Sequence, residues 1–181
     1  MNKALIIIDI QNDYFPGGLM ELYNPTEASE NAKQLLDKFR EDKSPVIHVK
    51  HLAATPEVGF FLPETEGAEI HENVKPNEGE KVITKYFPNA FRDTDLLEYL
   101  QLKNVTELVF SGMMTQMCID ATVRAAKDFG FECTVIGDAC ATRDLEINGN
   151  QVKASDVHNA FLAGLNFFYA EIKNTNDYLS T

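Results

Sequence analysis

Three ionisable residues each follow an apolar stretch of this sequence, and together they have the chemistry of a nucleophilic catalyst. Asp9 follows the run 4–8, Lys85 follows the run 81–84, and Cys118 comes shortly after the run 107–110. A cysteine can attack a carbonyl carbon, a carboxylate can remove its proton, and a lysine can hold both groups by its charge. These residues form one site only if the fold brings three strand ends together.

Cys118 lies just after the segment Ser111-Gly112-Met113-Met114, where a strand gives way to an amphipathic helix. With Thr115 as the N-cap, Cys118 would occupy the first turn of that helix. Unpaired backbone N–H groups and the positive end of the helix dipole stabilise a thiolate there. The alternative is a small buried thiol that fills space against a sheet, because free cysteines are among the most buried residues.

Asp9 and Lys85 each allow two interpretations. A partly buried Asp9 could act as a general base, or its side chain could cap the turn after the strand. A lone lysine at the start of a loop is usually solvated. Beside Asp9 and Cys118, however, Lys85 would balance the aspartate and favour a thiolate.

Short runs rich in β-branched residues alternate with segments of helical periodicity. The predicted strands are 4–8, 45–49, 81–84, 107–110, 132–136 and a late run near 168–172, and the predicted helices are 26–42, 93–102, 119–129 and 155–167. This alternation predicts an α/β fold, a three-layer α/β/α sandwich around a mostly parallel, Rossmann-like sheet of about six strands. We expect one domain over residues 1–181. Ligands of such sheets gather beyond the carboxyl ends of the strands, where Asp9 and Lys85 are predicted.

Residues 52–79 and 142–152 are predicted to be long loops, which often form lids or binding sites. Phe60-Phe61-Leu62 in the first loop would either plug the core or form a pocket wall.

The composition favours a small molecule as the partner. Sixteen basic and twenty-eight acidic residues give a net charge of −12, which opposes binding to nucleic acid or an anionic membrane. The first apolar run is too short for a signal peptide or membrane span, so we expect a cytoplasmic protein. Three cysteines without CxxC spacing predict reduced thiols, with Cys133 on a strand and Cys140 in the loop after it. The sequence contains no dinucleotide-binding or phosphate-loop motif, so we expect no cofactor.

Three motifs of the chain resemble those of the isochorismatase-like cysteine hydrolases, a group that includes nicotinamidases, N-carbamoylsarcosine and ureidoacrylate amidohydrolases, and isochorismatases. Asp9 lies in IIIDIQNDY, Lys85 in ITKYFPNAF, and Cys118 in FSGMMTQMCIDATVRAAKDFGF, which is followed by VIGDACAT. The resemblance extends from Lys3 to about Tyr169.

This resemblance implies a catalytic triad and a mechanism. Cys118 would attack a carbonyl, Asp9 would pass the thiol proton to the leaving group, and Lys85 would support both. Water would then hydrolyse the thioester. The family also implies a cis peptide bond between Met113 and Met114, and an oxyanion hole made by the N–H groups of Met114 and Cys118.

The resemblance argues against a metal cofactor. Nicotinamidases bind a metal through an Asp-x-His stretch and two later histidines, whereas here His51 falls at the aspartate position and Ala53 at the first histidine. His71 alone matches a ligand of that set. His51 and His71 are therefore weak metal candidates, and we expect a hydrogen-bonded His51 at a strand end and a His71 that steadies the loop.

The pocket around Cys118 is expected to have flat apolar walls that suit a small planar or aliphatic amide, with a few polar groups to orient it. The expected lining residues are Gln11, Tyr14, Phe15, Phe60, Phe61, Leu62, Tyr86, Phe87 and Gln116. Family resemblance also implies a homo-oligomer, a dimer or tetramer.

Two other functions remain open from the sequence. The first is hydrolysis of isochorismate, a vinyl ether, to give pyruvate. The second is a non-catalytic binding protein on the same fold, which would have an unreactive Cys118. The leading hypothesis is hydrolysis of a small amide or ureido compound through Cys118.

Overall fold

A parallel sheet forms the centre of the computed structural model, which describes residues 2–180. The two end residues of the expected domain, Met1 and Thr181, lie outside this range. The sheet has six strands in the order β3-β2-β1-β4-β5-β8, and all of its neighbouring strands pair in parallel. The strands are β1 (Lys3–Ile8), β2 (Val46–His51), β3 (Lys81–Lys85), β4 (Glu107–Met113), β5 (Glu132–Ala141) and β8 (Glu171–Lys173).

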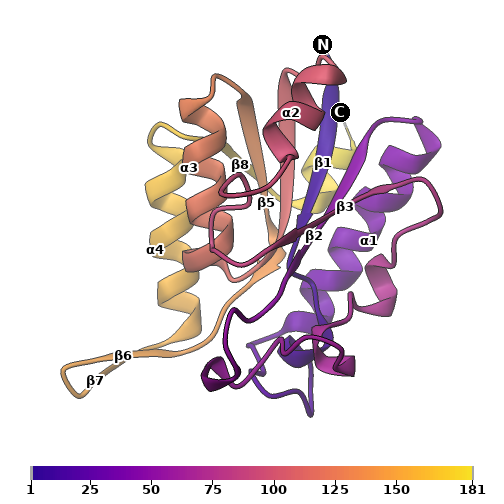
Figure 1. The fold of residues 1–181 in the computed structure, drawn as a ribbon. Helices are drawn as coiled ribbons and strands as arrows, with labels where there is room; N and C mark the ends of the chain where they lie inside the picture. The colour runs from indigo at the N-terminus through magenta and orange to yellow at the C-terminus, as the bar shows by residue number, and fades with distance from the viewer. Residues whose placement is uncertain (1, 181) are drawn as a thin grey trace.

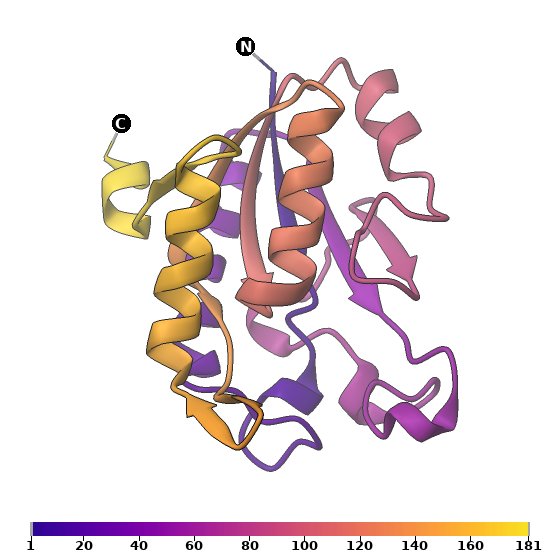
Figure 2. The same ribbon diagram turned by 90° about the vertical axis from the view of Figure 1, so that its left-hand side faces the viewer.

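Helices cover both faces of this sheet (Figure 1). Helices α1 (Pro25–Glu41) and α5 (Thr175–Leu179) lie on one face. On the other lie α2 (Leu96–Leu102), α3 (Asp120–Asp128) and α4 (Ala154–Asn166), of which α3 and α4 run side by side in Figure 2. The predicted three-layer α/β/α sandwich is confirmed. No helix within residues 2–180 is long and apolar enough to cross a membrane.

Strand β1 shows why the sheet needs both helical layers. Its alternate residues enter two separate cores: Ile6 and Ile8 pack with the layer that contains α3, and Leu5 and Ile7 pack with α1. A strand that is buried on both faces reads as a continuous apolar run rather than an alternating one.

Some predicted boundaries are wrong. The last strand starts at Glu171, and Phe168 is 65% exposed in the turn that follows α4, so the predicted run 168–172 is not a strand as a whole. The segment 142–152 is not only a loop, because it contains a hairpin of β6 (Leu145–Ile147) and β7 (Asn150–Val152) that extends beyond the body of the protein in Figure 1. The segment 52–79 contains three short 3₁₀ turns at Pro56–Val58, Glu66–Ala68 and Glu72–Val74.

The strand order places a switch point between β1 and β4. From β1 the chain proceeds through β2 and β3 toward one edge, and β4, β5 and β8 extend toward the other. Crevices for ligands form at such switch points, outside the carboxyl ends of the strands. Close contact at this point requires glycine, because Gly112 has a φ of +136° and a Cβ there would lie 2.0 Å from the carbonyl oxygen of Ile8.

Candidate active site

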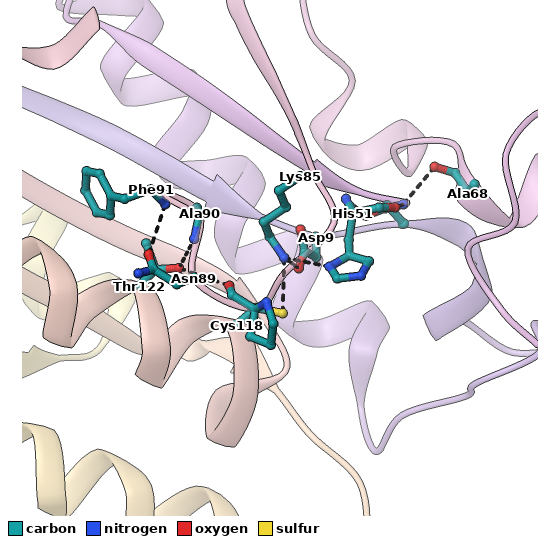
Figure 3. A network of polar contacts seen from close by, with 11 residues as sticks. Asp9, His51, Ala68, Lys85, Asn89, Ala90, Phe91, Cys118 and Thr122 are labelled. Carbon is teal, nitrogen blue, oxygen red and sulfur yellow. Dashed lines mark hydrogen bonds and ion pairs between the residues drawn. The ribbon is translucent and has the colours of Figure 1, made fainter. Parts of the chain in front are cut away.

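Asp9, Lys85 and Cys118 meet at the carboxyl edge of the sheet, as Figure 3 shows. Asp9 follows β1, Lys85 ends β3, and Cys118 lies in a π-helical turn, Thr115–Ile119, between β4 and α3. The Lys85 Nζ atom lies 2.7 Å from Asp9 Oδ2 and 3.2 Å from Cys118 Sγ. All three side chains are buried. The structure therefore brings the three sequence-predicted catalytic residues into one hydrogen-bonded group.

His51 completes the surroundings of the Lys85 ammonium group. It is the last residue of β2, pairs in register with Lys85, and places Nδ1 2.8 Å from Lys85 Nζ. The three N–H donors of the ammonium group thus have three partners: Asp9, Cys118 and His51. Sequence reasoning expected a hydrogen-bonded His51 but did not find Lys85 as its partner, because the pairing of β2 with β3 sets that contact.

Asp9 has an unusual backbone and a free carboxylate oxygen. Its φ is 52°, in the left-handed region, and its N–H donates to the carbonyl of Val49 at 3.0 Å. Of its two carboxylate oxygens, Oδ2 accepts from Lys85, whereas Oδ1 is buried without a hydrogen-bond partner in the described part of the chain. A carboxylate oxygen of Asp9 lies within 4.8 Å of Cys118 Sγ. The site thus contains an unused proton acceptor beside the thiol.

Burial determines the protonation of the thiol. It raises the pKa of Cys118, the negative charge of Asp9 raises it further, and the nearby Lys85 only partly opposes this effect. Burial alone would lower the pKa of Lys85, but the charge of Asp9 and the hydrogen bonds to Asp9 and Cys118 reverse this and raise it. Both shifts favour a neutral thiol beside an ammonium ion, whereas the sequence suggested a thiolate at this position.

The turn that carries Cys118 also differs from the predicted helix start. Thr115 is not the N-cap of a helix, because it is the first residue of the π-helical turn and its Oγ1 contacts the Ala141 carbonyl at 3.3 Å and His158 Nδ1 at 2.9 Å. The peptide bond between Met113 and Met114 is cis. The Met114 carbonyl accepts from the N–H groups of Met117 and Ile119, which are therefore occupied.

The residues do not fit a nicotinamidase-type metal site. Within residues 2–180, one group of three or more possible metal ligands is present: Asp9, His51 and Cys118. The ammonium group of Lys85 lies 2.7 to 3.2 Å from one atom of each, so this group occupies the position between them that a metal ion would need. His71 belongs elsewhere, since it stacks on Phe15 at 3.6 Å.

Gln11 does not orient a substrate, contrary to the sequence-based expectation. Its Oε1 accepts from the N–H of His51 at 2.8 Å, and its Nε2 donates to the carbonyls of His51 and Ala68 at 2.9 and 2.8 Å. The fully buried amide instead joins the end of β2 to the long loop.

Aromatic side chains from the long loop lie against the catalytic group. Phe61 packs 4.6 Å from Tyr14 and 6.0 Å from His51, measured between ring centroids, and Phe60 lies 4.9 Å from Phe61. Asp13 holds this segment, because its Oδ2 accepts from the N–H of Phe61 at 2.7 Å. Burial raises the pKa of Tyr14 well above its ordinary value, and the charge of Asp9 raises it further.

The other expected pocket residues are held in several ways. Phe15 is buried against His71, and Leu62 is half-buried. Phe87 lies under the guanidinium group of Arg92 at 3.6 Å, and Tyr86 is half exposed. Gln116 accepts a hydrogen bond from Thr142 at 2.5 Å.

The loop after Lys85 is tied to α3. Thr122 Oγ1 accepts from the N–H of Ala90 at 3.0 Å, and Asn89 Oδ1 accepts from the N–H of Phe91 at 2.9 Å (Figure 3). These contacts fix the end of β3 next to the turn that carries Cys118.

The remaining cysteines are buried packing residues. Cys133 lies on β5 as predicted, but Cys140 also belongs to β5 rather than to the loop after it, because β5 continues to Ala141. Burial raises the pKa of each thiol to about 12.

Comparisons with known proteins identify the family of this chain. A family model described as the isochorismatase domain matches residues 3–163. The uncharacterized isochorismatase family protein YddQ of Bacillus subtilis is 52% identical over 179 residues, which is 99% of each chain. A crystal structure from Oleispira antarctica, described as an isochorismatase hydrolase, has a TM-score of 0.96 and 46% identity, and the match covers 99% of this chain and 97% of that one. A streptothricin hydrolase of Streptomyces noursei is 32% identical over 143 residues, which is 79% of this chain and 51% of that protein. The chain therefore belongs to the isochorismatase family and is a hydrolase.

Proposed function

We propose that this hydrolase cleaves a C–N bond of a small amide or ureido compound through a thioester on Cys118. The observation that supports this most strongly is a buried thiol beside a carboxylate with one unused oxygen and an ammonium group with all donors engaged. The likeness to a streptothricin hydrolase also points to hydrolysis of a small molecule.

The proposed reaction begins with proton transfer within the site. As Cys118 Sγ attacks the carbonyl carbon, the thiol proton passes to Asp9, and the C–S bond forms. Asp9 then gives this proton to the leaving nitrogen as the C–N bond breaks. In the second half, Asp9 takes a proton from water, the water oxygen attacks the thioester carbon, and Asp9 returns the proton to Cys118 Sγ as the C–S bond breaks. Lys85 stabilises the negative charge whether it lies on Asp9 or on the sulfur of Cys118.

The N–H groups of Met114 and Cys118 are the proposed oxyanion hole. Their neighbours Met117 and Ile119 donate to the Met114 carbonyl instead, so those two N–H groups are not offered to the substrate. Loss of one such donor typically lowers the rate by a factor of about 100 or more.

A panel of small amides, ureides and isochorismate tests this function. Release of ammonia together with a carboxylate is the expected result, and Cys118→Ala should abolish it while Cys133→Ala, a matched control, retains it. Pyruvate release from isochorismate that survives in Cys118→Ala would contradict the proposal and favour vinyl-ether hydrolysis.

We also propose that two copies of the chain associate through α4. No charged residue occurs between Asp156 and Glu171, and Phe167 is 91% exposed. Because each chain carries a net charge of −12, this uncharged surface is where two copies meet with least repulsion. The adjacent hairpin β6–β7 is a two-stranded element, which is marginally stable alone and gains from a second chain.

Light scattering tests this association. We expect a dimer or larger assembly for the unchanged chain and for Leu102→Asp, which alters an exposed residue of α2. Phe167→Asp should give a monomer, and an assembly that persists in this variant would contradict the proposed surface.

The cytoplasm is the proposed location of the protein. All three cysteines are free thiols in the structure, and free thiols persist most readily in a reducing compartment.

A further inference from the structure

The hydrogen bond from Lys85 determines which nitrogen of His51 carries a proton. An ammonium group has only donors, so His51 Nδ1, at 2.8 Å from Lys85 Nζ, accepts. In a neutral imidazole the proton then lies on Nε2. His51 thus presents Nε2–H as a donor on the ring side opposite Lys85.

This donor has no protein partner in the described residues and is not fully buried. His51 is half-buried, and no hydrogen bond to its Nε2 occurs in the described residues. The buried side-chain atoms without partners are Asp9 Oδ1, His48 Nδ1 and Ser111 Oγ, a set that does not include His51 Nε2. The unpaired N–H is therefore accessible.

The ring that carries this donor lies beside the nucleophile. A ring nitrogen of His51 lies within 4.8 Å of Cys118 Sγ, and the ring of Phe61 lies 6.0 Å away as an apolar neighbour. A small molecule that placed its carbonyl carbon at Cys118 would therefore bring its adjacent atoms to His51.

The imidazole remains neutral in this environment. Burial lowers the pKa of His51, the positive charge of Lys85 lowers it further, and the charge of Asp9 only partly opposes these effects. Near pH 7 the ring is thus a donor through Nε2, and it does not accept through this atom.

Resting on the function proposed above, we infer that the Nε2–H of His51 binds the substrate, and that the substrate carries a hydrogen-bond acceptor next to its scissile carbonyl group. Ring nitrogens, carbonyl oxygens and ether oxygens are suitable acceptors. A group that offers only N–H donors at this position leaves two donors facing each other, and such a mismatch is costly in a buried site.

Two substitutions distinguish the roles of the two ring nitrogens of His51. His51→Asn places an amide oxygen near the position of Nδ1, where it accepts from Lys85, but it has no group at the position of Nε2. His51→Gln places an amide nitrogen near Nε2 and loses the acceptor for Lys85. The first variant removes the inferred substrate contact alone, and the second is its matched control.

Aromatic aldehydes are suitable probes because they need no knowledge of the substrate. An aldehyde forms a C–S bond with Cys118, and the thiol proton moves to the aldehyde oxygen to give a thiohemiacetal. Benzaldehyde has no ring acceptor, whereas the three pyridinecarboxaldehydes place a ring nitrogen at three different positions. The ring nitrogen also activates the aldehyde, so each affinity is divided by that of benzaldehyde and then compared between variants.

At least one pyridine isomer should gain affinity over benzaldehyde in the unchanged protein, and about tenfold of this gain should disappear in His51→Asn. His51→Gln should retain most of the ratio even if all aldehydes bind more weakly. An equal ratio in the unchanged protein and in His51→Asn, for all three isomers, would overturn the inference.

A separate measurement distinguishes this inference from the proposed function. If no aldehyde reacts at Cys118 in any variant, the proposed function fails. Nitrogen-15 NMR of His51 tests the inference even then: we expect a proton on Nε2 and none on Nδ1, with a shift of Nε2 when pyridine is added as an unreactive acceptor. A proton on Nδ1, or no shift of Nε2, would refute the inference.

Discussion

Replacing Lys85 by methionine should make the stability of the protein depend on pH, because it leaves the Asp9 carboxylate buried without its cation. The two charged atoms are 2.7 Å apart and both side chains are fully buried. At an effective dielectric constant of about 20, their attraction is about 6 kcal/mol before desolvation is subtracted. Removing one partner of a buried ion pair typically costs about 3–5 kcal/mol.

Protonation sets an upper limit to this cost. An unpaired buried carboxylate takes up a proton rather than remain charged. The unfolded chain releases that proton above about pH 4, so the folded variant binds one more proton than the unfolded chain, and its stability falls as the pH rises. The loss grows by up to about 1.4 kcal/mol per pH unit and reaches about 4 kcal/mol at pH 7.

Urea unfolding at several pH values between 4 and 7 measures this effect. The difference in unfolding free energy between the unchanged protein and Lys85→Met should widen with pH. The double variant Asp9→Asn/Lys85→Met contains neither charge, so it is the matched control, and its stability should remain more nearly constant. Parallel curves for the unchanged protein and Lys85→Met would refute the account of a buried, ionised pair.

Three further predictions concern the framework of the site. Gly112→Ala should lower the unfolding free energy by about 4 kcal/mol or more, because its Cβ would lie 2.0 Å from the Ile8 oxygen at a positive φ. Gly137→Ala is the control and should cost no more than about 1 kcal/mol, because the nearest atom to its Cβ would be a flexible side-chain end at 3.0 Å. Similar urea midpoints for the two variants would contradict this. Burial alone would raise the pKa of Glu80, but hydrogen bonds, the largest from Arg40, lower it from 4.5 to about 2. The unchanged protein should therefore lose up to about 3 kcal/mol of unfolding free energy as the pH falls through this interval. Glu80→Gln should lack this loss in acid-unfolding curves, and an acid transition identical to that of the unchanged protein would argue against the prediction. A chelator of divalent metals should leave the hydrolytic rate unchanged, because an ammonium group already occupies the position between the possible ligands, and inactivation that zinc reverses would contradict this.

The strand ends were predictable because residue type and position agree there. Asp9, Lys85 and Cys118 are polar or reactive residues that follow apolar runs, and the parallel sheet places the ends of such runs at one edge. The turn of the hairpin also has a sequence signal, the pair Asn148-Gly149. Both residues have the positive φ that such a turn requires. It was missed because the flanking strands have only three residues each.

Other features of the site depend on packing that the sequence does not encode locally. His51 meets Lys85 because β2 and β3 pair in a particular register. Gln11 appears to be a free polar group in the sequence, yet the fold uses its whole amide to join β2 and the long loop. Burial of Cys118 raises its pKa and so opposes the thiolate that its position before a helix suggested.

The most direct test of the central claim is the alkylation rate of each cysteine with iodoacetamide at neutral pH, followed by peptide mass spectrometry. The account predicts that Cys118 reacts at least about tenfold faster than Cys133 and Cys140, because Asp9 can take the thiol proton as the sulfur attacks, and that Asp9→Asn removes this advantage. Equal rates for the three cysteines, or a fast Cys118 that does not depend on Asp9, would contradict the claim that Asp9 activates Cys118 as the nucleophile.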